Sequence, residues 1–147
     1  MATDQAGHSA TTVREPVYTA LEDWVIEYFL PMFRRTLGGE YRWCAQWWKH
    51  DEAVSRLKSL WHSWEVLRLQ PGTGIGIWYR DYLDHQLPIL MGARGPFYQC
   101  NEATHREPHE AAADPAPNGW WDRDDALIRD TAAEVEEPGG EARHADV

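Results

Sequence analysis

One stretch of the chain, DEAVSRLKSLWHSWEVLRLQ at residues 51–70, places its apolar residues three or four positions apart. That spacing lines one face of an α-helix and does not fit a strand, whose faces alternate at every second residue. Asp51 and Glu52 lie in the expected first turn, where the helix dipole favours acidic side chains. The sequence PGTG at residues 71–74 ends the pattern. We therefore predict a helix that begins near Asp51, with one apolar face formed by Val54, Leu57, Leu60, Trp61, Trp64 and Leu67.

An earlier stretch shows the same helical spacing. It follows Thr19 and Glu22, which have the spacing of a capping box. Pro31 is expected to kink this helix because proline lacks a backbone donor, and Gly38 and Gly39 are expected to end it. Its predicted apolar face consists of Leu21, Trp24, Val25, Tyr28 and Met32, widened by Phe29 and Phe33.

A third helix is expected to follow Thr73, and Pro88 should bend it or end it near Leu87. Its apolar residues are Ile75, Trp78, Tyr79, Tyr82 and Leu83. No stretch shows a convincing strand alternation, and nine tryptophans supply large side chains for a small core. The predicted fold class is all-α, a small Trp-rich bundle of three main helices with an irregular C-terminal segment and disordered termini.

Composition and charge divide the chain into three parts. Residues 1–15 are predicted to be a disordered lead-in, residues 16–105 a helical domain, and residues 106–147 an acidic, mostly disordered tail. The tail has 12 acidic and 4 basic residues, a net charge of −8, and the first 105 residues have 12 acidic and 10 basic, a net charge of −2. Nucleic-acid binders usually carry a basic surface, so the charge argues against nucleic acid and favours a protein partner.

The sequence shows neither a secretory signal peptide nor a segment able to span a membrane. The longest apolar run, WVIEYFLPMF, contains Glu27 and Pro31 and is too short to cross a bilayer. We therefore expect a cytoplasmic protein without a membrane partner. A disulfide between Cys44 and Cys100 would not be favoured in that compartment.

Two cysteines and two histidines form a candidate metal site: Cys44, His50, Cys100 and His105. Two sulfurs and two imidazoles suit tetrahedral zinc, and a closed four-ligand site would be structural, with ligand atoms within about 4 Å of one another. Co-ligation requires a helix start near Asp51, because six residues of continuous helix would point Cys44 and His50 apart. The alternative is that the cysteines are small buried hydrophobic residues and that His50 caps or lines the helix. Structural zinc is the one cofactor that the sequence indicates.

Trp43, Trp47 and Trp48 form a second candidate feature. Trp47 and Trp48 are adjacent and diverge by about 100° on a helix, so these three side chains cannot all point into a three-helix core. One of them should be partly exposed or covered by the segment GPFYQC. Such a tryptophan belongs to a protein interface, to a platform on which nucleic-acid bases stack, or to the incidental edge of a large core. The lack of basic charge around it favours a protein partner over single-stranded nucleic acid.

Two other patterns carry less weight. In RDYLDH, the side chains of Asp81, Asp84 and His85 lie close together on a helix, as acid–base chemistry or a metal would require. No nucleophile or second ligand pair accompanies them, so a solvated helix face is the favoured interpretation. The glycines of GTGIG follow a helix and lack a P-loop lysine, so we assign them a turn.

The motifs R-W-C-x-x-W-W-x-H-x-E-A, R-L-x-x-L-W-x-x-W-E and, downstream, G-P-F-x-x-C-x-x-x-x-H occur between residues 24 and 105. In these motifs the chain resembles an uncharacterised actinobacterial family, the domain of unknown function 4913 family. The family pattern includes all four candidate ligands. Tyr79 and Gln86 stand where related sequences often have tryptophan and histidine. The resemblance implies an actinobacterial host and a setting among plasmid, phage or conjugative-element genes. It implies no catalytic residues, because the family has no established activity.

We therefore expect a non-enzymatic accessory or adaptor protein that binds another protein. The candidate partner-binding residues in the tail are Trp120, Trp121 and Ile128, within a short helix predicted at residues 120–135. The alternative hypothesis is a zinc-stapled small domain that contacts nucleic acid in the same genetic setting. The sequence does not predict the oligomeric state.

Overall fold

The computed structural model describes residues 14–122, and the chain separates after His109 into two units. The first unit contains three helical rods and no β-strand in the part described, where the only β-pairing is two isolated bridges at Leu37–Tyr41 and Tyr41–Gly92. The prediction of an all-α fold with three main helices is therefore confirmed. None of the helices among residues 14–122 has the length and apolar character needed to cross a membrane.

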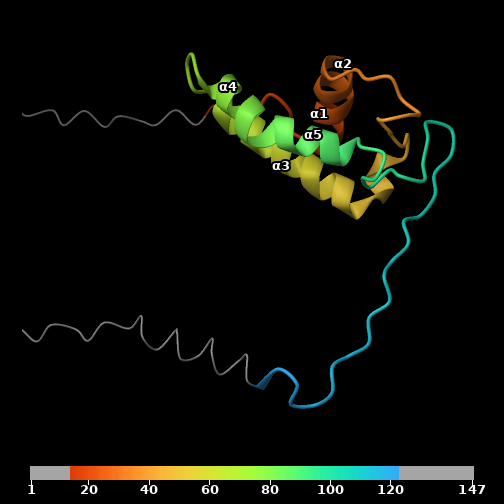
Figure 1. Ribbon diagram of the computed structural model, residues 1–147. Helices are drawn as coiled ribbons and strands as arrows, with labels where there is room; N and C mark the ends of the chain where they lie inside the picture. The colour runs from red at the N-terminus through yellow and green to blue at the C-terminus, as the bar shows by residue number, and fades with distance from the viewer. Residues whose placement is uncertain (1–13, 123–147) are drawn as a thin grey trace, which may run out of the picture. The chain divides into compact units, whose positions relative to one another are not determined.

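Two of the rods contain a π-helical turn. The first rod joins α1 (Leu21–Trp24), the π turn η1 (Val25–Phe29) and α2 (Leu30–Met32). A short 3₁₀ turn, η2 (Trp47–Lys49), precedes the second rod, α3 (Asp51–Leu67). The third joins α4 (Gly74–Trp78), the π turn η3 (Tyr79–Leu83) and α5 (Asp84–Leu90). Figure 1 shows α3 and α4–α5 side by side, with α1–α2 lying across them.

The first rod differs from its prediction in three ways. Its N-cap residue is Ala20, which forms no side-chain cap, so the predicted capping box of Thr19 and Glu22 is wrong. It ends at Met32 rather than at the glycines, because Phe33 leaves the helical conformation and packs its ring 6.0 Å from that of Trp78. The π turn adds a residue to one turn just before Pro31, which lacks the amide of a regular helix. The resulting change of register leaves Met32 54% exposed although it was predicted to be buried.

The second rod begins at Asp51, as predicted, and His50 is its N-cap residue without a side-chain cap bond. The third rod runs on to Leu90, although Pro88 was expected to bend it or end it near Leu87. Pro88 faces solvent, while Leu87 and Leu90 on the same turn are buried. Burial of those side chains holds the last turn in place despite the missing backbone donor.

Aromatic side chains join the three rods into one core. The ring of Trp64 on α3 lies 4.6 Å from that of Tyr28 on the first rod. Trp78 on α4 is fully buried, and its Nε1–H donates to the Leu60 carbonyl of α3 at 2.9 Å and to Ser63 Oγ at 3.1 Å. Burial of a large ring whose polar atom is satisfied stabilises the fold without a desolvation cost.

The turn between α3 and α4 requires glycine at position 74. A Cβ there would overlap the carbonyl oxygen of Leu67 and lie 2.8 Å from Gln70 Cβ, so Gly74→Ala should lower the free energy of unfolding by about 1–3 kcal/mol. Gly76, in the same helix, has nothing within 4 Å of the position that a Cβ would take. Gly76→Ala should raise stability by up to about 1 kcal/mol, because alanine is the better helix former. Urea unfolding measures the free energy of unfolding of both variants. Changes of the same sign and size in the two variants would contradict the special requirement for glycine at position 74.

Candidate metal centre

Four side chains from three places in the chain meet beside the start of α3. Cys44 lies in the loop after the first rod, and His50 is the residue that precedes α3. Cys100 and His105 lie in the irregular segment after the third rod. Cys44, His50 and Cys100 are each at most 2% exposed, and the His105 side chain is 12% exposed. The fold therefore brings together in a buried place the four residues that the sequence suggested.

The distances between the ligand atoms fit a tetrahedral metal. Cys44 Sγ lies 3.4 Å from His105 Nδ1, and Cys100 Sγ lies 3.5 Å from His50 Nε2 and 3.9 Å from His105 Nδ1. Zinc bonds of about 2.3 Å to sulfur and about 2.0–2.1 Å to nitrogen, arranged tetrahedrally, place sulfur and nitrogen about 3.5 Å apart. All four atoms lie within 4.8 Å of one another, somewhat wider than a closed tetrahedron. A small inward movement would complete the coordination.

A tight turn returns the chain from Cys100 to His105. The Asn101 side-chain oxygen accepts from the backbone N–H groups of Ala103 at 2.8 Å and Thr104 at 2.7 Å, and Asn101 N–H donates to the Thr104 carbonyl at 3.1 Å. An asparagine that bonds the backbone two or three residues ahead stabilises such turns locally. This turn directs the His105 side chain toward Cys100, which precedes it by five residues.

Phe97 covers the other side of the centre. Its ring is fully buried and lies 5.0 Å from that of His50 and 4.9 Å from that of Trp43, edge to face in both cases. These contacts restrict the orientation of the His50 ring and exclude water from it. Phe97 therefore links the metal centre to the aromatic core.

Polar groups outside the four residues orient the candidate ligands. His105 Nε2 lies 3.0 Å from Glu107 Oε2, a pairing that leaves Nδ1 directed at the two sulfurs. The backbone N–H of Arg106 donates to Cys100 Sγ at 3.3 Å, and its carbonyl oxygen, also 3.3 Å away, accepts from the thiol form. Carboxylate–histidine pairs and N–H donors to sulfur are the usual outer partners of metal ligands.

Burial lowers the pKa of the His50 imidazole below its ordinary value, and the neighbouring His105 lowers it further, against the opposing effect of Glu107. The Pro96 backbone also opposes the lowering of the pKa, but least of the four causes. His50 Nδ1 has no hydrogen-bond partner among residues 14–122. At neutral pH the imidazole is therefore uncharged. With its proton on Nδ1, the imidazole offers the Nε2 lone pair, which faces Cys100 Sγ, to a cation.

The Cys44 thiol is affected in the opposite direction. Burial raises its pKa and the adjacent Cys100 adds to the effect, while the Gln46 backbone and, more weakly, Lys49 oppose it. Without a cation, the buried Cys44 thiol therefore resists ionisation. A coordinated divalent cation reverses this balance, because a thiol bound to such a metal loses its proton. The donor set of two thiolates and two imidazoles suits zinc.

Residues 18–120 match the family described as "Domain of unknown function (DUF4913)". The chain belongs to this family. The matched range contains all four candidate ligands as well as Asn101 and Glu107. No curated protein and no solved structure matches the chain.

The other candidate residues form no comparable site within the DUF4913 range. Asp81, Asp84 and His85 are exposed, and Asp81 forms an ion pair with the adjacent Arg80 at 2.6 Å, as expected of a solvated helix face. Trp120 and Trp121 lie in the second unit and are exposed, and Ile128 lies outside the described residues, as does most of the predicted helix at residues 120–135.

Sequence reasoning missed three residues of the centre: Phe97, Asn101 and Glu107. The asparagine carried a local signal, because it directly follows a candidate ligand in a short segment that must turn back. The local signal for Glu107 was weaker: it is an acidic residue two positions after the candidate ligand His105. The place of Phe97 over His50 depends on contacts about fifty residues apart and had no local signal.

Proposed function

We propose that this chain is a non-enzymatic accessory or adaptor protein whose helical unit is stapled by a structural zinc ion. The ligands would be Cys44 Sγ, His50 Nε2, Cys100 Sγ and His105 Nδ1. The observation that carries the zinc proposal is the convergence of two sulfurs and two imidazole nitrogens in a buried place. A closed set of four protein ligands leaves no position for a substrate or a reactive water, so it supports a structural role rather than a catalytic one.

The zinc ion would join the segment after the third rod to the start of α3. That segment has no helix or strand to hold it between residues 91 and 106. Small domains with a limited core commonly depend on such a bound metal for stability, because binding and folding are coupled. The staple would keep the C-terminal loop of the unit in place for contacts with a partner.

The partner is proposed to be another protein, which the tail would contact through Trp120, Trp121 and Ile128. The near-neutral helical part and acidic tail support a protein over nucleic acid. The proposed setting is the cytoplasm of an actinobacterium, among genes of a plasmid, phage or conjugative element. Deletion of residues 119–147 should abolish co-purification of the partner from the host; full retention would contradict docking through the tail.

Metal content tests the zinc proposal directly. Protein purified without chelator should contain about one zinc per chain by elemental analysis. Cobalt substituted for zinc should give the intense visible absorption of a tetrahedral site with thiolate ligands. Less than a few tenths of a zinc per chain, with no cobalt spectrum after reconstitution, would contradict the proposal.

Glu107 should act as a positioning residue for His105. Glu107→Gln is expected to weaken zinc affinity about tenfold, because the variant loses the charged partner that fixes the orientation of the His105 imidazole. The expected loss is small for such a residue because the Glu107 side chain is 76% exposed. Competition with a chromophoric chelator measures the affinity. Glu102→Gln, an exposed acid in the same loop, is the control and should leave it unchanged.

A further inference from the structure

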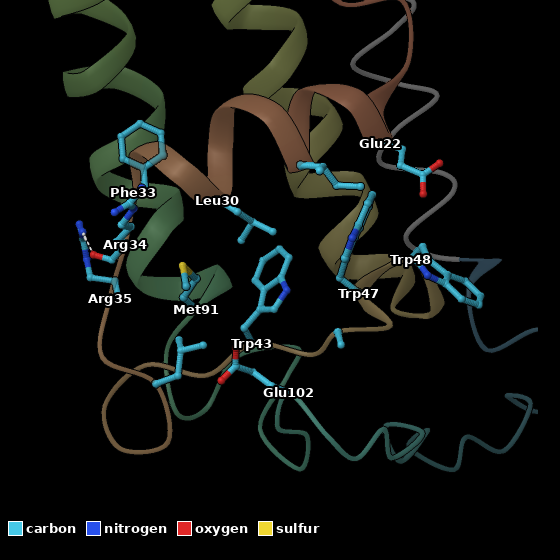
Figure 2. Close-up of a pocket in the computed structure, with 13 residues that line it drawn as sticks. Glu22, Leu30, Phe33, Arg34, Arg35, Trp43, Trp47, Trp48, Met91 and Glu102 are labelled. Carbon is cyan, nitrogen blue, oxygen red and sulfur yellow. Dashed lines mark hydrogen bonds between the residues drawn. The ribbon is translucent and has the colours of Figure 1, made fainter.

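A groove of about 720 Å³ lies on the helical unit outside the metal centre. Figure 2 shows the first rod above it and Trp43, Trp47 and Trp48 below and beside it. Glu22, Ile26 and Leu30 of the rod contribute to its lining, as does Phe33, which directly follows the rod. The volume falls within the roughly 300–1,000 Å³ of typical ligand pockets.

The groove presents large apolar side chains to solvent. Ile26 is 53% exposed and Trp48 is 56% exposed, while Trp43 and Trp47 are buried at its base. The Nζ of Lys49 lies 5.4 Å from the centre of the Trp48 ring, a cation–π contact that favours this exposed position of the indole. Tryptophan is enriched among the residues that contribute most to protein interfaces, so an exposed indole at the rim of this groove is a candidate contact for another molecule.

Charges of opposite sign lie at the two ends of the groove. Arg34 and Arg35 are at one end and Glu22 is at the other (Figure 2). Arg34 Nε donates to the Pro31 carbonyl at 3.0 Å, and Arg35 donates to the Arg34 carbonyl at 2.9 Å. Neither guanidinium forms an ion pair within residues 14–122. The arginine end therefore complements a ligand that carries acidic groups at one end.

The form of the groove favours a helix as its ligand. The described residues offer no sheet edge, so an extended peptide would find no ladder for its backbone hydrogen bonds. A helix satisfies its own backbone and presents only side chains. The lining contains two acidic residues, Glu22 and Glu102, against two arginines, so it does not attract a phosphate backbone.

We propose that this groove binds an amphipathic helix of a partner protein. Apolar side chains spaced three or four residues apart enter between Ile26 and Trp48, and acidic residues at one end of the helix meet Arg34 and Arg35. The inference rests on the proposed adaptor function and gives it a second surface, distinct from the tail. An adaptor with two surfaces can bridge two proteins.

The test uses the full zinc-loaded chain and a displayed library of 16-residue peptides built on a helical scaffold, randomised on one face and at both ends. The expected selected sequences have apolar residues at positions i, i+3, i+4 and i+7 and acidic residues at one end. Ile26→Asp should weaken their binding at least tenfold, as should Trp48→Ala. Met32→Asp is the matched control, because Met32 is 54% exposed on the same rod and does not line the groove.

Reversing the charge of the two arginines at the end of the groove provides a second test of the proposal. Selection against the double variant Arg34→Glu, Arg35→Glu should yield basic rather than acidic ends. The proposal is overturned if no helical peptide is enriched, if Ile26→Asp and Met32→Asp act equally, or if charge reversal leaves the selected charge unchanged. It is also overturned if the wild type is a dimer that Ile26→Asp converts to a monomer, because a second copy would then occupy the groove. A partner from the host that co-purifies equally with wild type and Ile26→Asp would leave the adaptor function standing and reject only the groove.

Discussion

Replacing Cys100 with serine is expected to abolish stoichiometric zinc binding and to lower the free energy of unfolding by about 4 kcal/mol when free zinc exceeds the wild-type dissociation constant a thousandfold. Cys100 Sγ faces both candidate imidazoles and accepts from the backbone N–H of Arg106. A serine hydroxyl is a far weaker zinc ligand than a thiolate. Elemental analysis and urea unfolding of zinc-loaded protein measure the two effects.

A chelator separates the role of the metal from that of the thiol. With zinc removed, wild type and Cys100→Ser should differ by no more than about 1 kcal/mol, because only a small buried side chain has changed. His85→Ala, at an exposed histidine far along the third rod, should retain both zinc and stability. An equal loss of stability in Cys100→Ser with and without chelator would show that Cys100 acts through burial alone.

Trp78→Ala is expected to lower the free energy of unfolding by about 3–5 kcal/mol, the usual cost of removing a large buried aromatic side chain. The Trp78 ring is fully buried against Phe33, and its Nε1–H joins the third rod to α3 through Leu60 and Ser63. Trp78→Ala removes the ring contacts and the hydrogen bonds of Nε1–H, and it leaves a cavity. Urea unfolding followed by circular dichroism measures the change.

Trp48→Ala is the matched control for this effect. Trp48 is 56% exposed, so its removal should change the free energy of unfolding by less than about 1 kcal/mol. Trp78→Phe should fall between the two, because it keeps most of the ring volume and loses the donor. Equal destabilisation by Trp78→Ala and Trp48→Ala would contradict the buried role of Trp78.

The helical architecture could be predicted because its signals are local. The apolar spacing from Val54 to Leu67 and the acidic pair before it predicted a helix that begins at Asp51, where the structure begins it. The prediction that the three clustered tryptophans could not all be buried is confirmed, with Trp48 as the exposed one. The predicted ends of the other two rods were less accurate: the first rod ends at Met32, before Gly38 and Gly39, and the third continues past Pro88 to Leu90. The packing of Phe33 against Trp78 and the burial of Leu87 and Leu90 decided these ends.

The sequence by itself determined which side chains could form a metal site and that α3 must begin after His50 for them to meet. Only the tertiary structure decided that they do meet, since Cys44 and Cys100 are joined by no local pattern. Contacts between Phe97 and His50, the Asn101 turn and the pairing of Glu107 with His105 place the ligand atoms. Helix formation depends on neighbours three or four residues apart, and the metal centre depends on contacts between segments some fifty residues apart, so sequence periodicity could reveal the first and not the second.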